Sequence, residues 1–190
     1  LIEAASELFG QPVDIQGAGR TDAGVHALAQ VAHIETSKKM PPQKILYGLN
    51  DRLPATVNVL KVEEATPRFH ARHHAKTRVY IYQISRRRTA FGKKFVWWVK
   101  DELNVKKMLS AAQAFQGFHD FVSFADKRFD KDASTKVMLD SVELMEHDDL
   151  IIVRITGSHF LWKMVRRMVG MLVEVGRQNL TRRDVENMLD

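Results

Sequence analysis

Residues 137–155 read Val-Met-Leu-Asp-Ser-Val-Glu-Leu-Met-Glu-His-Asp-Asp-Leu-Ile-Ile-Val-Arg-Ile, and this stretch decides the fold. Two runs rich in apolar residues flank the polar residues His147, Asp148 and Asp149, a composition that favours a turn between two strands. We therefore predict an antiparallel hairpin with strands over residues 137–145 and 150–155.

The segment after this hairpin has the period of a helix. Apolar residues fill a wide arc over residues 160–175 at 3.6 residues per turn, so we predict a long helix that ends at Gly176. On this helix Arg166 falls at the margin of the apolar arc, beside Trp162 and Val173. An arginine at such a margin most often extends its charged group to water.

The rest of the chain predicts a mixture of helices and strands. We expect helices over residues 1–9, 42–52 and 105–116 and from Thr181 onward, and strands over residues 25–36, 57–62 and 79–84. Asn104 is a suitable N-cap, and Asp184 follows Thr181 at the spacing of a capping box. The predicted class is α+β, with a mixed, mainly antiparallel sheet and helices on one face.

The composition narrows the classes of function. The 190 residues are 45% hydrophobic, which suits one large domain or two small ones, and the net charge of +6 favours a polyanionic partner. The sequence has no cysteine, which excludes disulfides, thiolate nucleophiles and cysteine-ligated zinc and fits a reducing compartment. No apolar run is long enough for a membrane helix, so we expect no membrane association.

A second stretch carries the candidate chemistry. Residues 17–27 read Gly-Ala-Gly-Arg-Thr-Asp-Ala-Gly-Val-His-Ala, and their glycines permit a tight backbone that a ligand can approach closely. Arg20 lies two residues before Asp22 and can hold that carboxylate ionised, and an ionised, positioned carboxylate can act as a nucleophile. The alternative is an aspartate that caps a turn, which spacing alone makes the commoner role.

The string over residues 19–27 resembles the catalytic loop of the TruA family of tRNA pseudouridine synthases. Four further motifs resemble that family in the same order: Gly48-Leu49-Asn50 with Leu53-Pro54; Phe69-His70-Ala71-Arg72 with Ala75, Arg78, Tyr80 and Tyr82; Gly117 with His119-Asp120-Phe121 and Ser123-Phe124; and Phe160-Leu161 with Met164-Val165-Arg166 and Val169-Gly170. The resemblance implies two ferredoxin-like halves, over residues 1–90 and 91–190, that share a sheet and flank a central cleft.

Some family features differ here. The Tyr-Asp-Gly and Gly-Trp-Gln signatures with which the family opens and the Gly-Leu-x-Leu strand with which it closes do not occur in this sequence. We therefore expect that the start of the first half and the end of the second are missing. The chain also reads Thr135-Lys136-Val137 where the family commonly has Thr-x-Arg, which leaves substrate contacts there open.

The resemblance implies a tRNA-uridine isomerase that makes pseudouridine, in the anticodon stem-loop, as a cytoplasmic homodimer without cofactor or metal. Asp22 would start glycosidic cleavage as nucleophile or base, Arg166 would pair with Asp22, and Tyr80 would stack on the uracil. The residues expected to contact RNA are Arg20, Thr21, His26, Arg72 and Arg78.

Each of these residues has a structural alternative. Tyr80 suits a strand tyrosine packed on the core, and His26 suits a brace that hydrogen-bonds the loop. The basic clusters suit either a groove for RNA backbone or a solvated surface: Lys38-Lys39, Arg72, Arg86-Arg87-Arg88 and Lys93-Lys94. The aromatic residues Phe95, Trp97 and Trp98 suit the core or a dimer interface better than base stacking.

Three histidines, His70, His73 and His74, could ligate a metal, but no acid or cysteine lies near them in sequence, so we predict no metal site. Two other functions compete with the isomerase. A catalytically inactive RNA-binding relative would not need Asp22, Tyr80 and Arg166 together. A carboxylate hydrolase for a small molecule would need a second acid and would leave the basic excess unexplained.

Overall fold

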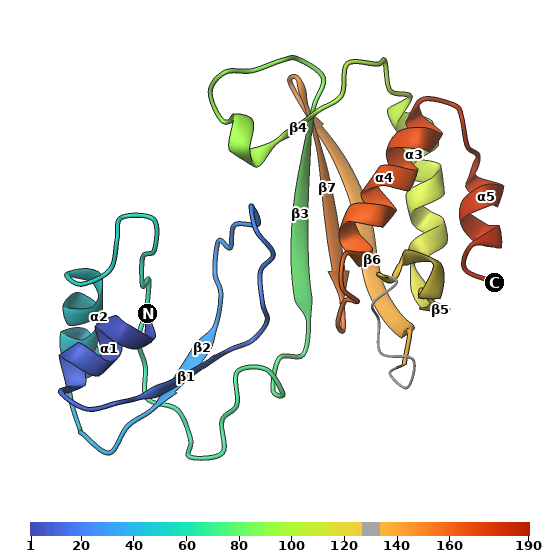
Figure 1. Cartoon of the computed structure of the whole chain (residues 1–190). Helices are drawn as coiled ribbons and strands as arrows, with labels where there is room; N and C mark the ends of the chain where they lie inside the picture. The colour runs from blue at the N-terminus through green and yellow to red at the C-terminus, as the bar shows by residue number, and fades with distance from the viewer. Residues whose placement is uncertain (127–133) are drawn as a thin grey trace. The chain divides into compact units, whose positions relative to one another are not determined.

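The computed structural model describes residues 1–126 and 134–190, which form two compact units, Leu1–Ala75 and Lys76–Asp190 (Figure 1). The halves implied by the family resemblance divide after residue 90. In the structure the strand β3 (Arg78–Ser85) belongs to the second unit, because it pairs along its whole length with β7 (Leu150–Gly157). The two ferredoxin-like halves stay a prediction.

The first unit consists of two helices and a small antiparallel hairpin. The helices are α1 (Ile2–Phe9) and α2 (Pro42–Asn50), and the strands β1 (Asp14–Gly17) and β2 (Ala32–Glu35) pair over four residues each. Ala4, Ala5, Phe9 and Leu49 form its core. The helices expected at the start of the chain and after Pro41 are therefore confirmed.

The Gly48-Leu49-Asn50 motif explains how this small unit closes. A Cβ at position 48 would lie 2.6 Å from Cδ1 of Leu8, so the glycine allows α2 to approach α1 closely. Asn50 donates from Nδ2 to the carbonyl of Val59 at 2.9 Å and accepts the Val59 N–H at 2.7 Å. This side chain thus satisfies the backbone groups that a strand partner would take. The strand predicted over residues 57–62 is wrong, because the described structure has no strand there.

The second unit contains a five-stranded sheet in the order β4-β3-β7-β6-β5. Its other strands are β4 (Trp97–Trp98), β5 (Gly117–Asp120) and β6 (Lys136–His147), and every pair is antiparallel except β3 with β4. The helices α3 (Val105–Ala112), α4 (Met164–Gly176) and α5 (Arg182–Asn187) lie on one side of the sheet (Figure 1). This confirms the predicted α+β class.

The core of the second unit lies between the sheet and these helices. Alternate residues of β7 are fully buried, namely Ile151, Val153 and Ile155, and they share one cluster with Met168 and Leu172 of α4. The predicted hairpin is confirmed as β6 and β7, which pair from His147 and Leu150 back along both strands. None of the helices formed by the described residues has the length and apolar character needed to cross a bilayer.

Two helix starts confirm the local signals in the sequence. The Asn104 side chain accepts the N–H of Lys107 at the start of α3. Thr181 and Asp184 form a reciprocal capping box at the start of α5. Three short 3-10 turns complete the unit, at Lys93–Phe95, Gln113–Phe115 and Val122–Phe124.

Two predicted elements begin several residues later than expected, and α3 ends at Ala112, before the predicted residue 116. The strand expected over residues 25–36 is confined to Ala32–Glu35, because β1 offers only four residues for pairing. The helix expected from Phe160 begins at Met164. Lys163 has a φ of 63°, a left-handed conformation that stops a right-handed helix from continuing toward Phe160.

Candidate active site

The loop over residues 18–31 joins β1 to β2 and carries Asp22. Two hydrogen bonds close its base: the Ala18 N–H donates to the Val31 carbonyl at 2.8 Å, and the Gln30 side chain donates to the Gly19 carbonyl at 2.6 Å. The loop is therefore fixed at its neck, directly next to the four-residue strand pair.

Asp22 begins a tight turn within this loop. The Val25 N–H donates to the Asp22 carbonyl at 3.0 Å, and Gly24 has a φ of 79° at the third position. A positive φ at that position is the pattern of a type II turn, which favours glycine. The glycine of the motif is thus required by the backbone, and the turn expected around Asp22 is formed by its main chain, while its side chain is exposed.

Three further predicted site residues lie on the same loop as Asp22. Arg20, Thr21 and His26 are all exposed, so a single loop brings four of the eight predicted residues together. Exposed arginine and hydroxyl side chains beside a turn can contact phosphate groups. The loop therefore has the chemical groups that binding of a polyanion requires.

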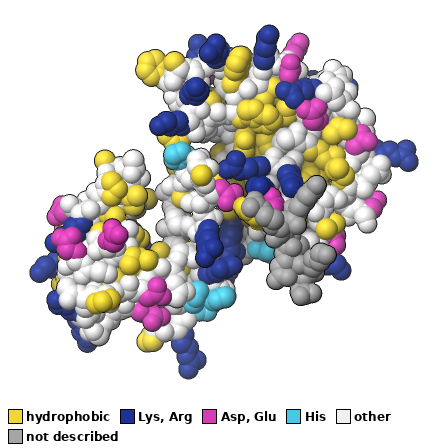
Figure 2. Space-filling view, viewed as in Figure 1, with side chains coloured by type: hydrophobic (Ala, Val, Ile, Leu, Met, Phe, Trp, Pro, Cys, Tyr) yellow, Lys and Arg dark blue, Asp and Glu magenta, His cyan; other side chains and the backbone are white. Residues whose placement is uncertain are grey.

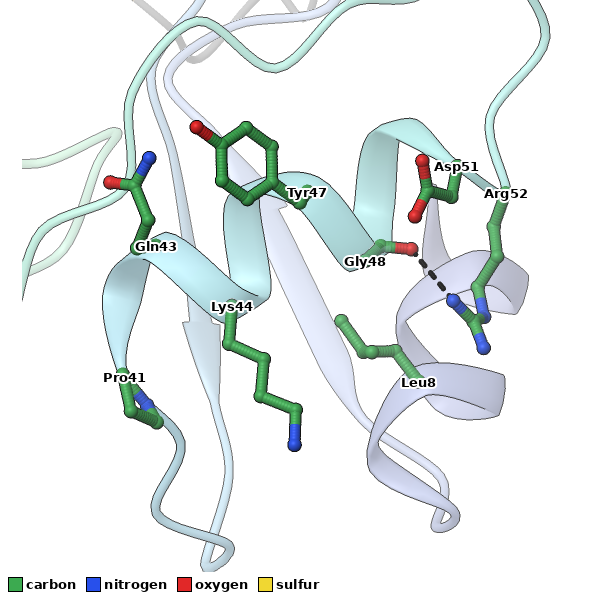
Figure 3. A pocket seen from close by; sticks show the side chains of 8 residues that line it. All are labelled: Leu8, Pro41, Gln43, Lys44, Tyr47, Gly48, Asp51 and Arg52. Carbon is green, nitrogen blue, oxygen red and sulfur yellow. Dashed lines mark hydrogen bonds between the residues drawn. The ribbon is translucent and has the colours of Figure 1, made fainter.

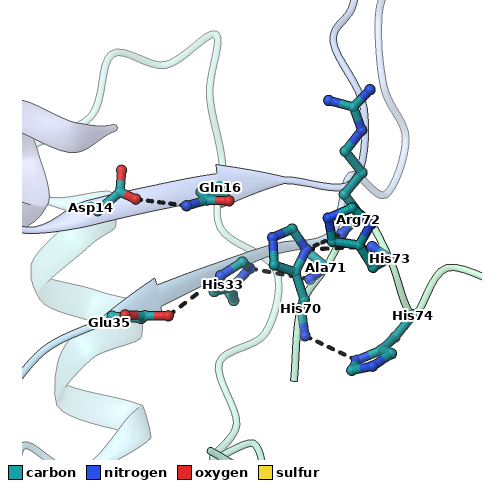
Figure 4. A network of polar contacts seen from close by, with 9 residues as sticks. All are labelled: Asp14, Gln16, His33, Glu35, His70, Ala71, Arg72, His73 and His74. Atoms are coloured by element: carbon teal, nitrogen blue, oxygen red, sulfur yellow. Dashed lines mark hydrogen bonds and ion pairs between the residues drawn. The ribbon is translucent and has the colours of Figure 1, made fainter. Parts of the chain in front are cut away.

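Arg72 lies on a second segment of the first unit. The preceding residue, Ala71, is buried, and its N–H donates to Nδ1 of His33 on β2 at 3.1 Å (Figure 4). His33 follows the loop over residues 18–31 by two residues. The Phe69-His70-Ala71-Arg72 motif is thereby attached to the strand that leaves the Asp22 loop.

Tyr80 and Arg78 lie on one side of β3 in the second unit, and both contact the segment that leads to α4. Nη1 of Arg78 donates to the carbonyl of Ser158 at 2.9 Å. The ring of Tyr80 meets the ring of Phe160 edge to face, with centroids 4.7 Å apart. Tyr80 is half-buried, whereas Tyr82 packs against the main core.

Helix α4 carries Arg166, and its start is held by contacts that the sequence did not reveal. Nζ of Lys163 donates to Oδ2 of Asp126 at 2.7 Å, and the Asp126 side chain is only 8% exposed. The Asp126 N–H donates to the Trp162 carbonyl, and the Arg167 guanidinium donates to the Ala125 carbonyl. The signal available in the sequence was a single acid directly after the apolar run that ends at Ala125.

Arg166 lies beside the buried face of α4, as expected, because Val169 and Val173, three and seven residues further on, are both buried. Its side chain is exposed. Because α4 begins at Met164, Trp162 is not part of the helix and does not lie one helical turn before Arg166, as the sequence pattern assumed. Asp22 belongs to the first unit, and Tyr80 and Arg166 belong to the second, so the pairing of Arg166 with Asp22 stays a prediction.

The Gly117–Asp120 strand and the turn after it have structural roles. His119 Nε2 lies 2.8 Å from the Gln116 carbonyl, and Oδ1 of Asp120 accepts the Val122 N–H at 3.0 Å. Phe121 and Phe124 are buried and their rings pack together. This motif therefore builds the core of the second unit.

The basic and aromatic residues that follow β3, up to and including β4, lie at the surface. Arg86 pairs with Glu146 and Arg87 with Asp149, and the Arg88 guanidinium lies 5.7 Å from the ring centroid of Trp98. In Figure 2, Lys and Arg side chains lie beside hydrophobic ones at the top of the second unit. Of the two positions expected for the aromatic residues, the core or a dimer interface, the core is wrong, because the exposed fractions are 54% for Phe95, 36% for Trp97 and 41% for Trp98.

A hollow lies beside α1 and α2 in the first unit (Figure 3). Arg52 donates to the Gly48 carbonyl at 2.9 Å and pairs with Glu7 at this junction. No predicted site residue is among the described residues that line it: Leu8, Pro41, Gln43, Lys44, Tyr47, Gly48, Asp51 and Arg52. Within residues 1–126 and 134–190, no group of three or more His, Cys, Asp or Glu has the arrangement of a metal site.

Comparison with known proteins bears on this arrangement. The sequence profile of a family described as tRNA pseudouridine synthase matches residues 1–74 and 111–190. A tRNA pseudouridine synthase A 2 from Bacillus cereus is 37% identical over 187 residues, which are 97% of this chain and 76% of the relative. A tRNA pseudouridine synthase A from Maricaulis maris is 38% identical over 193 residues, covering 100% of this chain and 77% of the relative. On these matches, together with the loop that presents Asp22, the chain belongs to the tRNA pseudouridine synthase family.

Proposed function

We propose that this chain isomerises uridine to pseudouridine in tRNA, and that Asp22 starts the reaction. The observation that carries the proposal is the Asp22 loop, closed at its neck and turning tightly at Gly24, in a chain of the tRNA pseudouridine synthase family. An exposed carboxylate on a fixed loop can reach a nucleotide that has left its helix stack. A catalytically inactive role is not supported, because the matched relatives carry the names of synthases.

The reaction breaks one bond and forms another. The glycosidic bond between C1′ and N1 of uridine is cleaved, the uracil turns, and C1′ joins C5. C5 then loses its proton, and N1 takes up a proton, so that the atoms balance. Asp22 acts as the group that initiates cleavage, by attack on the sugar, by attack on the base, or by taking a proton. No oxidant, reductant or external group is consumed, because the product is an isomer of the substrate.

Arg166 and Tyr80 are proposed to complete the catalytic set. A guanidinium stays protonated and can bind a carboxylate through two parallel donors, so Arg166 suits a partner for Asp22. Tyr80 suits a platform for the uracil, because the edge-to-face contact with Phe160 fixes its ring. Hydrogen bonding to Ser158 fixes Arg78 in the same region of the second unit.

The residues proposed to contact RNA are the exposed side chains of the Asp22 loop, Arg20, Thr21 and His26, together with Arg72 and Arg78. Such contacts with phosphate provide affinity and orientation but do not read the base sequence. We place the modified uridines in the anticodon stem-loop and the enzyme in the cytoplasm. The exposed aromatic residues Phe95, Trp97 and Trp98 support a homodimer, because large exposed aromatic side chains are enriched in interfaces.

The test is tritium release from tRNA labelled at uridine C5, with this chain, Asp22→Asn and Asp14→Asn. Asp14 is the matched control, because it is an exposed aspartate of the same hairpin that accepts a hydrogen bond from Gln16. The parent and Asp14→Asn should release tritium, whereas Asp22→Asn should bind tRNA without release.

Release by Asp22→Asn at the parent rate would overturn the role of Asp22. Silence from the parent with every tRNA tested would overturn the synthase function. Hydrolysis of a small ester or amide by the parent, abolished in Asp22→Asn, would favour the hydrolase instead. The three results therefore distinguish a wrong role for Asp22, a wrong function for the chain, and a hydrolase.

A further inference from the structure

Four histidines of the first unit form a cluster beside β2 (Figure 4). The ring centroids of His33 and His70 are 4.7 Å apart, and those of His70 and His73 are 4.1 Å apart. His74 completes the cluster by contact with Phe69 and a hydrogen bond to His70. Rings this close would repel one another if they were protonated together.

The hydrogen bonds of the cluster define its protonation state. Nδ1 of His33 accepts the Ala71 N–H at 3.1 Å, and Nδ1 of His74 accepts the His70 N–H at 3.0 Å. Nδ1 of His70 faces two backbone donors, the N–H groups of Arg72 at 3.2 Å and His73 at 3.4 Å. An imidazole nitrogen accepts a hydrogen bond only when it carries no proton. The arrangement therefore requires neutral rings with the proton on Nε2.

Acid acts against this arrangement in two ways. A proton on Nδ1 would turn each acceptor into a donor that faces another N–H group, and it would place positive charges on adjacent rings. Partial desolvation, followed by the neighbouring His73, His33 and His74, lowers the pKa of His70, while Glu35 opposes the shift. The exposed Glu35 carboxylate is also the acidic group that faces Nε2 of His33, at 4.0 Å.

The histidine cluster fixes the backbone of Arg72, one of the residues predicted to contact RNA. Arg72 lies within the turn that these Nδ1 atoms fasten, and Figure 4 shows its side chain directed away from the imidazoles. The hydrogen bond from the Ala71 N–H to His33 joins this turn to β2, and β2 begins directly after the neck of the Asp22 loop. The position of Arg72 relative to that loop thus depends on the bond between Ala71 and His33.

We propose that His33 is a positioning residue for tRNA binding: its neutral imidazole fastens the turn that carries Arg72 to β2, and protonation of the histidine cluster releases that turn. The inference rests on the proposed function through Arg72 alone. It predicts that mild acid weakens tRNA binding. General electrostatics predicts the opposite, because added positive charge on histidines attracts a polyanion.

The first experiment tests the cluster without RNA. Long-range proton–nitrogen correlation spectra of the labelled chain at about pH 7.5 report which nitrogen of each imidazole carries the proton. We expect the Nε2–H form at His33, His70 and His74. A proton on Nδ1 of His33 or His70 would overturn the inference while leaving the synthase function intact.

The second experiment measures the Kd for tRNA between about pH 7.5 and about pH 5.5. The Kd of the parent should rise about tenfold, the order of magnitude expected for loss of one charged contact. His33→Ala should show that weakening already at the higher pH. His33→Asn should bind as the parent does there, because its side-chain oxygen can accept the Ala71 N–H without titrating, and it should lose less affinity on acidification.

Two controls separate this role from a general one. Arg72→Gln should bind tRNA more weakly at the higher pH and show no further weakening in acid. His147→Asn, at an exposed turn of the second unit, should follow the parent curve. A parent Kd that stays constant or falls in acid, or a His33→Asn variant as weak as His33→Ala, would overturn the inference. If the chain binds no tRNA at all, the proposed function fails and the spectra alone decide the state of the cluster.

Discussion

The Asp126 carboxylate accepts a hydrogen bond from the Lys163 ammonium at 2.7 Å, at the residue that precedes helix α4. Lys163 has a left-handed backbone there, and the Asp126 N–H also binds the Trp162 carbonyl. The chain therefore turns into α4 at a point fixed by both the side chain and the main chain of Asp126. Arg166, the proposed partner of Asp22, follows Lys163 by three residues and so lies in the first turn of the helix that begins beside this ion pair.

The first prediction concerns that ion pair. Asp126→Asn keeps a hydrogen-bond acceptor but removes the charge that faces Lys163, and Asp126 is nearly buried. We expect a loss of about 1–3 kcal/mol in the free energy of unfolding, measured by urea denaturation. The single-turnover rate on tRNA should also fall, because the start of α4 and with it Arg166 is less firmly held.

The matched control is Asp101→Asn, which breaks the exposed ion pair with Arg177 at 2.7 Å. That change should alter stability by less than about 1 kcal/mol, because exposed ion pairs contribute little. Equal losses in the two variants would show that Asp126 does not fix the helix start.

The second prediction concerns the amide of Asn50. Asn50→Asp removes the donor to the Val59 carbonyl and brings a carboxylate oxygen toward that carbonyl. We expect a loss of about 1–3 kcal/mol in the free energy of unfolding, because the carbonyl of the half-buried Val59 loses the side-chain donor that Asn50 provides. Hydrogen exchange of the Val59 amide should become faster, because repulsion between the new carboxylate and the Val59 carbonyl displaces the side chain from both backbone groups.

Asn58→Asp is the control for this charge change, because Asn58 is an exposed asparagine next to Val59. It should leave both the free energy of unfolding and the exchange rate close to those of the parent. A similar loss in Asn58→Asp would mean that added charge, and not the lost donor, is responsible.

The third prediction concerns acid and the start of α5. Hydrogen bonds from the Thr181 side chain and then its backbone lower the pKa of Asp184 below the ordinary aspartate value of about 3.9. The folded form thus prefers the charged carboxylate, and this stabilisation is present above that ordinary value. It is lost as the pH falls through the lowered folded pKa.

A carboxyl-carbon NMR titration measures this pKa directly. Thr181→Ala should raise it toward the ordinary value, and Thr181→Ser should keep it low, because serine retains the hydroxyl that donates to Asp184. An unchanged pKa in Thr181→Ala would contradict the assignment of the shift to this cap.

The fourth prediction concerns the ring contact that holds Tyr80. Phe160→Ala removes the edge-to-face partner at 4.7 Å, so Tyr80 loses a fixed orientation. We expect kcat to fall about tenfold or more while the Kd for tRNA changes little, since one ring among many contacts contributes little to affinity. Phe160→Tyr should restore the rate, because it keeps the ring. A lower affinity with an unchanged kcat would assign Phe160 to RNA binding instead.

The elements with local signals could be predicted from the sequence. Thr181 and Asp184 carry the spacing of a capping box, and the His147-Asp148-Asp149 turn lies between two strand-like runs. The strand expected over residues 57–62 failed because the Asn50 amide provides the partner that a strand would need. Here a side chain takes the place of a strand partner, and the periodicity of the sequence gives no sign that Asn50 and Val59 are in contact.

The candidate site was predictable where a motif lies in one segment, as in the loop that carries Asp22. It was not predictable where the contacts are distant. Asp126 and Lys163 are 37 positions apart in the sequence, and His33 and Ala71, which are joined by a hydrogen bond, are 38 positions apart. The helix wheel placed Arg166 beside Trp162 and Val173. The buried Val173 is its neighbour on α4, but Trp162 is not, because the left-handed Lys163 ends the helix before it.

The neck of the Asp22 loop has a consequence for how such enzymes can diverge. Ala18 and Val31 are joined by one backbone hydrogen bond, so the loop leaves and re-enters the hairpin at a single place. Residues 19–30 take part neither in the pairing of β1 with β2 nor in the core of Phe9 and Leu49 in the same unit. The loop residues that contact a nucleotide can therefore change during evolution while the scaffold that holds the loop stays the same.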